Sequence, residues 1–322
     1  MQPPSTNLDS FKKANGDGFA DAEADGDGAK WFMAYLATTT GDNNSSFDHD
    51  LIFVLYKIHA MAHTPHIWEA AQNIGARPYQ EDRYVVAERF CMGYSLFAIM
   101  DGHGGEFVAD YVRTHLVRTV KEAIESQRDY NIRTALIRSF HKLHDDLPFQ
   151  ESYTCGCTCV VVLLHDNHLW VANCGDSRAI TTDGQHNIDI SFDHKPNNPS
   201  ELARIRRSGG DVLEIEGVPR VIGELAVSRS IGDKRYTPYV IPSPDITYLP
   251  LSHHNRYVLL STDGLWDVMT SKNVDTFVRG MIASERPSLA DVNNALIKRA
   301  YELGAQDNVT VLLCLRHGQK NT

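Results

Sequence analysis

The sequence lacks several features that would indicate a particular class of protein. Only six of its 322 residues are cysteine, too few for a secreted fold held by disulfides. No apolar run approaches the roughly 20 residues of a membrane-spanning helix. The first residues have neither the basic start nor the apolar centre of a secretory signal. We therefore expect no membrane span, free thiols, and a reducing intracellular location in the cytoplasm or the nucleus.

Positive charge is also scarce. Lys and Arg number 31 against 41 Asp and Glu, which gives a formal net charge of −10. Proteins that bind nucleic acid by neutralising phosphates are usually basic, so the composition argues against a nucleic-acid partner. Residues 1–65 contain nine acids and four bases and carry −5 of the charge, so residues 66–322 carry the other −5.

The pattern of the chain changes near residue 66. Residues 1–30 are rich in Gly, Asp, Asn and Ala and show no apolar period, which predicts a partly disordered N-terminal extension over residues 1–65. A calcium loop beginning at Asp21 would need a bidentate Glu at its twelfth position, where the chain has Phe32. Calcium sensing by these acids is retained only as an alternative. Residues 66–316 are predicted to form one domain, followed by a short tail at 317–322.

Within this domain the apolar pattern predicts both strands and helices. Fully apolar or alternating runs indicate strands at 84–86, 95–100, 158–165, 169–173, 178–182, 257–261 and 309–315. Apolar stripes at helical spacing indicate helices at 106–126, 131–146, 272–283 and 288–303. Because the strands follow one another through hairpins and the helices come in separate blocks, we expect an α+β fold with antiparallel sheets.

Carboxylates recur at the ends of the predicted strands. Asp101 and Asp263 each follow an apolar strand, Asp307 precedes the last strand, and Glu81-Asp82 opens an early one. Apart from Arg83, which follows Asp82, no Lys or Arg lies directly beside them in the sequence. Clustered carboxylates without counter-charge repel each other strongly. Oxygen-only donors suit Mg²⁺ or Mn²⁺. For either Asp-Gly pair taken alone, a simple turn is the favoured interpretation.

Seven segments of the chain form a recognisable series. They are Arg77 with Glu81-Asp82, Asp101-Gly102-His103-Gly104-Gly105, Gly156-Cys157-Thr158, Asn173 to Arg178, Leu225 to Asp233, Asp263-Gly264-Leu265-Trp266-Asp267, and Asp307-Asn308. In this order they resemble the metal-dependent protein serine/threonine phosphatases of the 2C type. The resemblance covers about residues 66–316. It implies a central sandwich of two antiparallel β-sheets flanked by α-helices on both sides, in four layers (α-β-β-α).

The resemblance also implies a metal centre. Asp101 resembles the carboxylate that bridges two Mn²⁺ or Mg²⁺ ions. The carbonyl of Gly102 and the carboxylate of Glu81 resemble ligands of one ion, and Asp263 and Asp307 resemble ligands of the other.

Two further acids, Asp176 and Asp267, resemble those that hold a weaker third ion together with Asp263.

Three residues resemble the family's catalytic groups. Asp82 corresponds to the acid that orients the attacking water, Arg77 to the residue that grips the substrate phosphate, and His103 to the general acid. The expected activity is hydrolysis of phosphoserine and phosphothreonine in proteins by a water activated at a binuclear Mn/Mg centre, without a covalent phosphoenzyme. We expect a monomer that acts in signal transduction. Two alternatives stay open: a non-catalytic scaffold with the same fold, and a hydrolase of small phosphoesters.

Other conspicuous residues are interpreted more simply. Cys155, Cys157 and Cys159 alternate, as they would on one face of a strand, and are predicted to pack rather than to bind metal. Trp266 is predicted to pack against the core. The basic cluster from Arg204 to Arg207 lies either in a substrate-selecting flap, which the resemblance implies, or on a solvated helix face.

Overall fold

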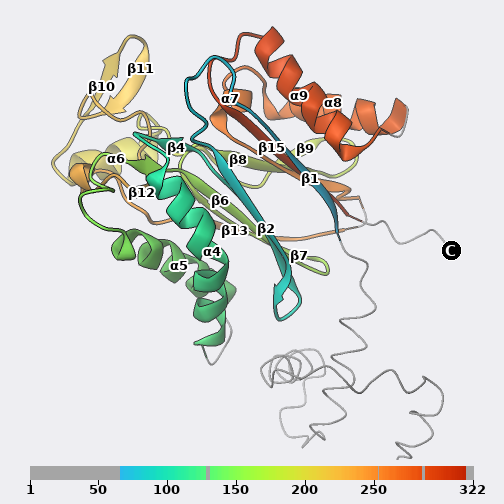
Figure 1. The fold of residues 1–322 in the computed structure, drawn as a ribbon, viewed down its shortest axis with the longest axis horizontal. Coiled ribbons are helices and arrows are strands. Elements are labelled where there is room, and N and C mark those ends of the chain that lie inside the picture. Colours follow the sequence, from blue (N-terminus) through green and yellow to red (C-terminus); the bar gives the residue numbers. More distant parts are fainter. Residues whose placement is uncertain (1–65, 128–130, 253, 285–286, 317–322) are drawn as a thin grey trace, which may run out of the picture. The chain divides into compact units, whose positions relative to one another are not determined.

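The computed structural model describes residues 66–127, 131–252, 254–284 and 287–316, and Figure 1 shows how their elements are arranged. The predicted N-terminal extension and C-terminal tail lie outside the described residues, so the predicted domain boundaries stay predictions. None of the helices in these ranges is both long enough and apolar enough to cross a bilayer.

Two five-stranded sheets form the centre of the domain. All strand pairings within both sheets are antiparallel. The first sheet contains, in spatial order, β1 (Ile67–Asn73), β15 (Val309–Leu315), β14 (Tyr257–Ser261), β8 (Arg178–Thr182) and β9 (Asn187–Asp189). The second contains β13 (Asp245–Pro250), β7 (His168–Cys174), β6 (Cys159–His165), β3 (Tyr94–Met100) and β2 (Arg83–Cys91).

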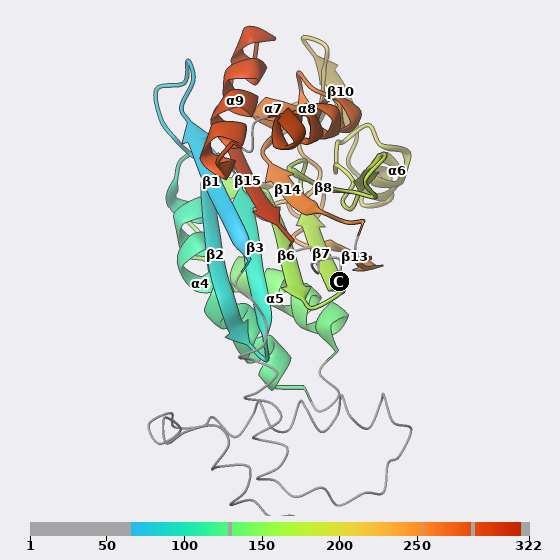
Figure 2. The same ribbon diagram turned by 90° about the vertical axis from the view of Figure 1, so that its right-hand side faces the viewer.

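Helices cover the outer face of each sheet, as Figures 1 and 2 show. The first sheet is covered by α8 (Ser271–Ser284) and α9 (Leu289–Glu302), with the short α7 (Asp263–Trp266) beside them. The second is covered by α4 (Phe107–Glu125) and α5 (Ile132–Asp146). This arrangement confirms the predicted α+β fold with two antiparallel sheets between layers of helices.

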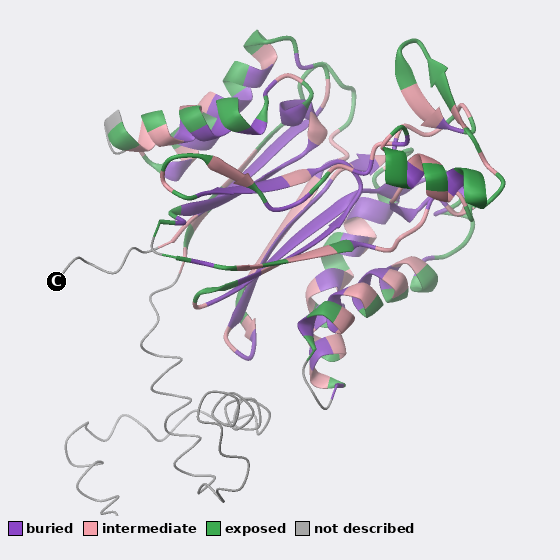
Figure 3. Ribbon diagram, turned by 180° about the vertical axis from the view of Figure 1, so that it is seen from behind, coloured by how far each residue is buried: buried purple, intermediate pink, exposed green. Residues whose placement is uncertain are grey.

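Apolar side chains fill both the space between the sheets and the space beneath the helices. In β14, Leu259 packs under α8 and α9, whereas Val258 and Leu260 face the second sheet. Side chains of a strand alternate between its two faces, and here both faces are covered. That is why the central strands read as continuous apolar runs and are buried along their length in Figure 3.

The strands that the sequence did not predict lie at sheet edges or in small sheets. The edge strands β1 and β13 have a largely exposed or half-exposed face and contain polar residues such as Glu69 and Thr247. A hairpin of β10 (Val212–Ile215) and β11 (Val218–Val221) stands next to α6 (Pro199–Arg207). A separate three-stranded sheet contains β12 (Ile231–Gly232), β5 (Gly156–Cys157) and β4 (Gly102–His103).

The cysteine prediction needs one correction. Cys155, Cys157 and Cys159 do not share one strand, because the chain changes from β5 to β6 at Thr158. The Thr158 N–H donates to the Asp101 carbonyl at 2.9 Å, and its hydroxyl accepts from the Asp101 N–H at 3.1 Å. All three cysteines are nonetheless buried free thiols. Trp266 is buried in the core beneath the helices, as predicted.

The space between the sheets is predicted to dominate stability. Phe97 lies there with 1% of its surface exposed. Phe97→Ala should lower the free energy of unfolding by about 3–5 kcal/mol, because the lost contacts leave a cavity. Phe192→Ala, at a side chain that is 67% exposed, is the matched control and should change it by less than about 0.5 kcal/mol. Urea denaturation of both variants measures the difference, and equal losses would contradict the assignment of the core.

Candidate active site

The predicted acids converge at one end of the sandwich. Asp101 follows β3 of the second sheet, and Asp263 follows β14 of the first. Burial raises the pKa of Asp101 well above its ordinary value, and the negative charge of Asp263 adds to the rise. Asp82, Asp176 and Asp307 contribute in the same direction. Residues far apart in the sequence therefore form one electrostatically coupled cluster.

Other acids of the cluster show the same effect. Burial raises the pKa of Asp263 to about 8, and the charges of Asp176 and Asp267 add to it. Burial likewise raises the pKa of Asp82 to about 7, although hydrogen bonds from Thr310 and Thr262 oppose the shift. Carboxylates whose ionised forms are this unfavourable need a positive partner.

The donor chemistry fits a hard divalent cation, because the gathered side chains offer only carboxylate oxygens. Within the described ranges, however, no three His, Cys, Asp or Glu side chains are placed so that they could hold a metal ion as they stand. The acids thus lie near one another, but their side chains do not form a complete metal-coordination shell in this arrangement.

Glu81 and Gly102, predicted to bind the same ion, are in direct contact. A Cβ atom at Gly102 would lie 2.5 Å from the Glu81 carbonyl oxygen, so only glycine permits this approach. The Glu81 carboxylate accepts a hydrogen bond from the Gly105 N–H at 2.7 Å. The backbone N–H of Glu81 donates to the Asn308 side-chain oxygen at 2.8 Å. These bonds join the segments before β2, after β4 and before β15.

Asp82 is held by the first sheet, although it precedes a strand of the second. Its Oδ2 accepts hydrogen bonds from the hydroxyls of Thr310 at 2.7 Å and Thr262 at 3.0 Å. Only 2% of Asp82 is exposed. Asp82 is therefore a buried member of the cluster with a fixed orientation.

Arg77, predicted to bind phosphate, lies at the rim of the cluster. Its Nη2 is 2.6 Å from Oδ2 of Asp307, and both side chains are partly exposed. The predicted phosphate-binding group thus pairs with a predicted metal ligand.

Lys195 is a residue of the site that the sequence analysis missed. Its Nζ lies 2.5 Å from Oδ2 of Asp176, 3.8 Å from Oδ1 of Asp267 and 4.0 Å from Oδ2 of Asp263. These are the three acids predicted to hold a third ion. The sequence analysis found no base beside Asp263, and the structure shows that another segment of the chain brings one to it.

Asp233 is the second residue that was missed. Its Oδ2 lies 2.7 Å from Nε2 of His103 and also accepts a hydrogen bond from Ser230. Burial alone would lower the pKa of His103, but the charge and hydrogen bond of Asp233 outweigh it and raise the pKa. A Cβ atom at Gly156 would collide with the Asp233 carboxylate, so glycine is required there. The position of Asp233 within a matching segment was the available signal.

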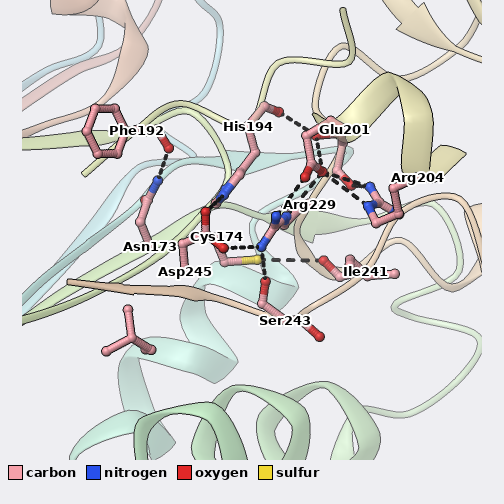
Figure 4. A network of polar contacts seen from close by, with 12 residues as sticks. Asn173, Cys174, Phe192, His194, Glu201, Arg204, Arg229, Ile241, Ser243 and Asp245 are labelled. Carbon is pink, nitrogen blue, oxygen red and sulfur yellow. Dashed lines mark hydrogen bonds and ion pairs between the residues drawn. The ribbon is translucent and has the colours of Figure 1, made fainter. Parts of the chain in front are cut away.

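A buried ionic network, shown in Figure 4, anchors α6 beside the cluster. Glu201 accepts from Arg229 at 2.6 and 3.1 Å and from Arg204 at 2.9 Å. Arg229 also donates to Asp245 at 2.8 Å. Arg204 therefore belongs to the interior.

The neighbouring arginines of α6 face outward. Arg206 pairs with the exposed Asp211 at 2.9 Å, and Arg207 is exposed. The basic cluster thus divides between an internal ion pair and a solvated helix face.

The domain thus combines a four-layer α-β-β-α fold with a cluster of acids at one end of the sandwich, beside which lie Arg77 and the pair of His103 with Asp233. Residues 81–309 match the family model "Protein phosphatase 2C". The chain belongs to this family.

Curated relatives from plants agree with this assignment. The chain is 32% identical to Protein phosphatase 2C 16 of Arabidopsis thaliana in an alignment that covers 77% of this chain and 61% of that protein. It is 33% identical to Probable protein phosphatase 2C 56 of Oryza sativa subsp. japonica, with 79% of this chain and 72% of the relative covered. The chain spans less than two thirds of the length of the Arabidopsis protein.

Solved structures show the same fold. A sex determining protein of C. elegans superimposes with a TM-score of 0.72 at 22% identity, covering 90% of this chain and 82% of the other. A phosphatase of Toxoplasma gondii superimposes with a TM-score of 0.68 at 24% identity, covering 79% and 95%. The two identities are too low to indicate more than a shared architecture.

The Glu201 network predicts a pH-dependent contribution to stability. Burial alone would raise the pKa of Glu201, but hydrogen bonds and charges of Arg229 and Arg204 lower it to about 2. A lowered pKa stabilises the fold above the ordinary value of 4.5, by about 3 kcal/mol at neutral pH, and this contribution disappears as the pH falls toward 2. Glu201→Gln should therefore cost about 3 kcal/mol at pH 7 and less at pH 3.5.

Urea denaturation at both pH values measures the loss. Glu302→Gln, at a half-exposed carboxylate that pairs with Arg299, is the control and should change stability by less than about 1 kcal/mol. A loss in Glu201→Gln that stays constant between pH 7 and 3.5 would contradict the ionic origin of the effect.

Proposed function

We propose that this chain is a metal-dependent protein serine/threonine phosphatase, which hydrolyses phosphoserine and phosphothreonine at a binuclear Mn/Mg centre without a covalent phosphoenzyme. Membership of the family supports the reaction class. The observation that carries the proposal is the cluster of mutually coupled carboxylates at one end of the sandwich.

The residues that would hold the ions follow from this arrangement. Asp101 would bridge two ions; Glu81 and the Gly102 carbonyl would complete one site, and Asp263 and Asp307 the other. Asp176 and Asp267, with Asp263, would hold a weaker third ion. When bound, a pair of divalent ions neutralises the phosphate and lowers the pKa of a water for in-line attack.

Arg77 would orient the substrate. A planar guanidinium can donate two parallel hydrogen bonds to phosphate oxygens. Its side chain is 52% exposed in the pair with Asp307, so it can turn toward a substrate. If Asp307 bound a metal ion, the Arg77 guanidinium would be released from this pair and could bind the substrate phosphate.

Asp82 would orient the attacking water. Its buried carboxylate has a fixed position because two threonine hydroxyls donate to one of its oxygens.

His103 would protonate the leaving group. Asp233 engages its Nε2, which leaves Nδ1 to donate a proton to the serine or threonine oxygen as the P–O bond breaks. The raised pKa of His103 keeps the imidazole protonated to higher pH, as a general acid requires.

We further propose that the protein acts as a monomer in signal transduction, on phosphoproteins and not on nucleic acid, inside the reducing cytoplasm or nucleus. The six free thiols, all of which are buried, are compatible with such a compartment. The acidic composition supports the exclusion of nucleic acid.

Assays on a phosphothreonine peptide and a phosphotyrosine peptide, with Mn²⁺ and with EDTA, test the proposed activity. We expect hydrolysis of the phosphothreonine peptide with Mn²⁺ and none with EDTA. Asp101→Asn and Asp263→Asn should each lower the rate at least about 100-fold while the melting temperature is retained, because each removes a metal ligand. Asp145→Asn, at an exposed aspartate of α5, is the control and should leave the rate unchanged.

Two outcomes would contradict the proposal: activity that survives the chelator, or full activity of Asp101→Asn. Preference for a small phosphoester such as a nucleotide over the phosphothreonine peptide would favour the alternative of a small-molecule hydrolase.

The role of His103 predicts a dependence on the leaving group. An alkoxide needs a proton as it leaves, whereas p-nitrophenolate leaves readily without one. His103→Gln should therefore slow phosphothreonine hydrolysis by about 10²-fold and p-nitrophenyl phosphate hydrolysis by less than about 10-fold. His186→Gln, at a side chain that is 75% exposed, is the control and should leave both rates unchanged. Equal losses on both substrates would assign His103 a structural role instead.

A further inference from the structure

Lys195 is the positive group that the fold itself places among three acids of the proposed metal centre. Its ammonium contacts Asp176 most closely and lies within 4.0 Å of Asp267 and Asp263. We propose that Lys195 is a tethered cation that competes with a divalent ion for these three carboxylates, and so sets how weakly the third ion binds. This inference rests on the proposed function.

The competition follows from charge and space. The ammonium and a divalent ion would need the same carboxylate oxygens, and two cations within about 4 Å of each other repel strongly at a partly buried site. Binding of a third ion therefore requires Lys195 to leave Asp176. The affinity measured for that ion includes the loss of this ion pair.

The backbone that carries Lys195 is fixed by its neighbours. His194 donates its N–H to the Gly175 carbonyl at 2.9 Å and accepts from the Gly175 N–H through Nδ1 at 3.1 Å. Its Nε2 therefore carries the proton and donates to Asp245 at 3.2 Å (Figure 4). Asp193 in turn forms two bonds of 2.8 Å with Arg178.

These contacts place residue 195 beside the loop that holds Asp176. The Lys195 side chain is 33% exposed, whereas that of Asp176 is only 4% exposed. The long lysine stem can therefore swing toward solvent while the aspartate stays in place. Asp176 is thus fixed and the Lys195 ammonium can move, as displacement of Lys195 by a metal ion requires.

Removal of the charge should make the site depend on added metal. Without the ammonium, the nearly buried Asp176 loses the only hydrogen bond that a lysine or arginine side chain gives it among the described residues. The metal-free protein should then be less stable, and a divalent ion should restore more stability than it does in the unchanged protein.

The test compares Lys195→Met and Lys195→Gln with the unchanged full-length protein. Both variants remove the charge, and Lys195→Gln keeps a hydrogen-bond donor in case Lys195→Met does not fold. Isothermal titration calorimetry with Mn²⁺ alone measures affinity and stoichiometry, and thermal unfolding with and without Mn²⁺ gives a second readout. Lys142→Met, at a 52% exposed lysine of α5, is the matched control.

We expect the weakest Mn²⁺ site to bind at least tenfold more tightly in both Lys195 variants, and the Mn²⁺-induced rise in melting temperature to increase. Lys142→Met should match the unchanged protein. Unchanged or weaker binding of the weakest ion in the Lys195 variants would overturn the proposal, because Lys195 would then merely hold the acids in place.

Failure of the underlying function is distinguishable. If the unchanged protein binds no Mn²⁺, both proposals fall. If Asp101→Asn keeps the full stoichiometry and affinity for Mn²⁺ while the Lys195 variants still tighten the weakest site, the assignment of the bridging carboxylate fails and the role of Lys195 stands.

Discussion

Repulsion among carboxylates gathered at one end of the β-sandwich is the constraint on which the rest of the site depends. Burial and mutual charge raise the pKa of Asp101 and Asp263, so the cluster is costly to assemble in its ionised form. Two sheets packed through a largely apolar interior supply the rigidity that holds these groups together. The packed strands therefore keep the acids close together against this repulsion.

The domain answers this repulsion partly with its own cations. Lys195 meets Asp176, and Arg77 meets Asp307. In the proposed enzyme, both bases leave their acids when divalent ions bind. Lys195 is displaced from Asp176, and Arg77 becomes a ligand of the substrate phosphate. The net charge of −5 over residues 66–322 already counts these two bases. In the proposed enzyme, divalent ions from solution would neutralise the acids that remain unpaired.

How much could be predicted depended on burial. The runs at 178–182, 257–261 and 309–315 were predicted at the bounds that the structure shows, because both faces of these strands are covered and the pattern is unbroken. The edge strands β1 and β13 were not predicted, since one side of each is exposed to solvent and their polar residues interrupt the apolar pattern. The acids of the proposed metal centre could be named from the sequence because each stands at the end of a predictable strand or in a matching segment.

The sequence by itself determined the family, the class of fold and the chemical groups available to the site. Only the tertiary structure decided which groups meet. Asp233 lies 130 residues from His103, and Asp307 lies 230 residues from Arg77. Hydrogen bonds and Coulomb interactions depend on distance in space, whereas a local pattern records distance along the chain. The partners Lys195 and Asp233 therefore became visible only when the two sheets brought their segments together.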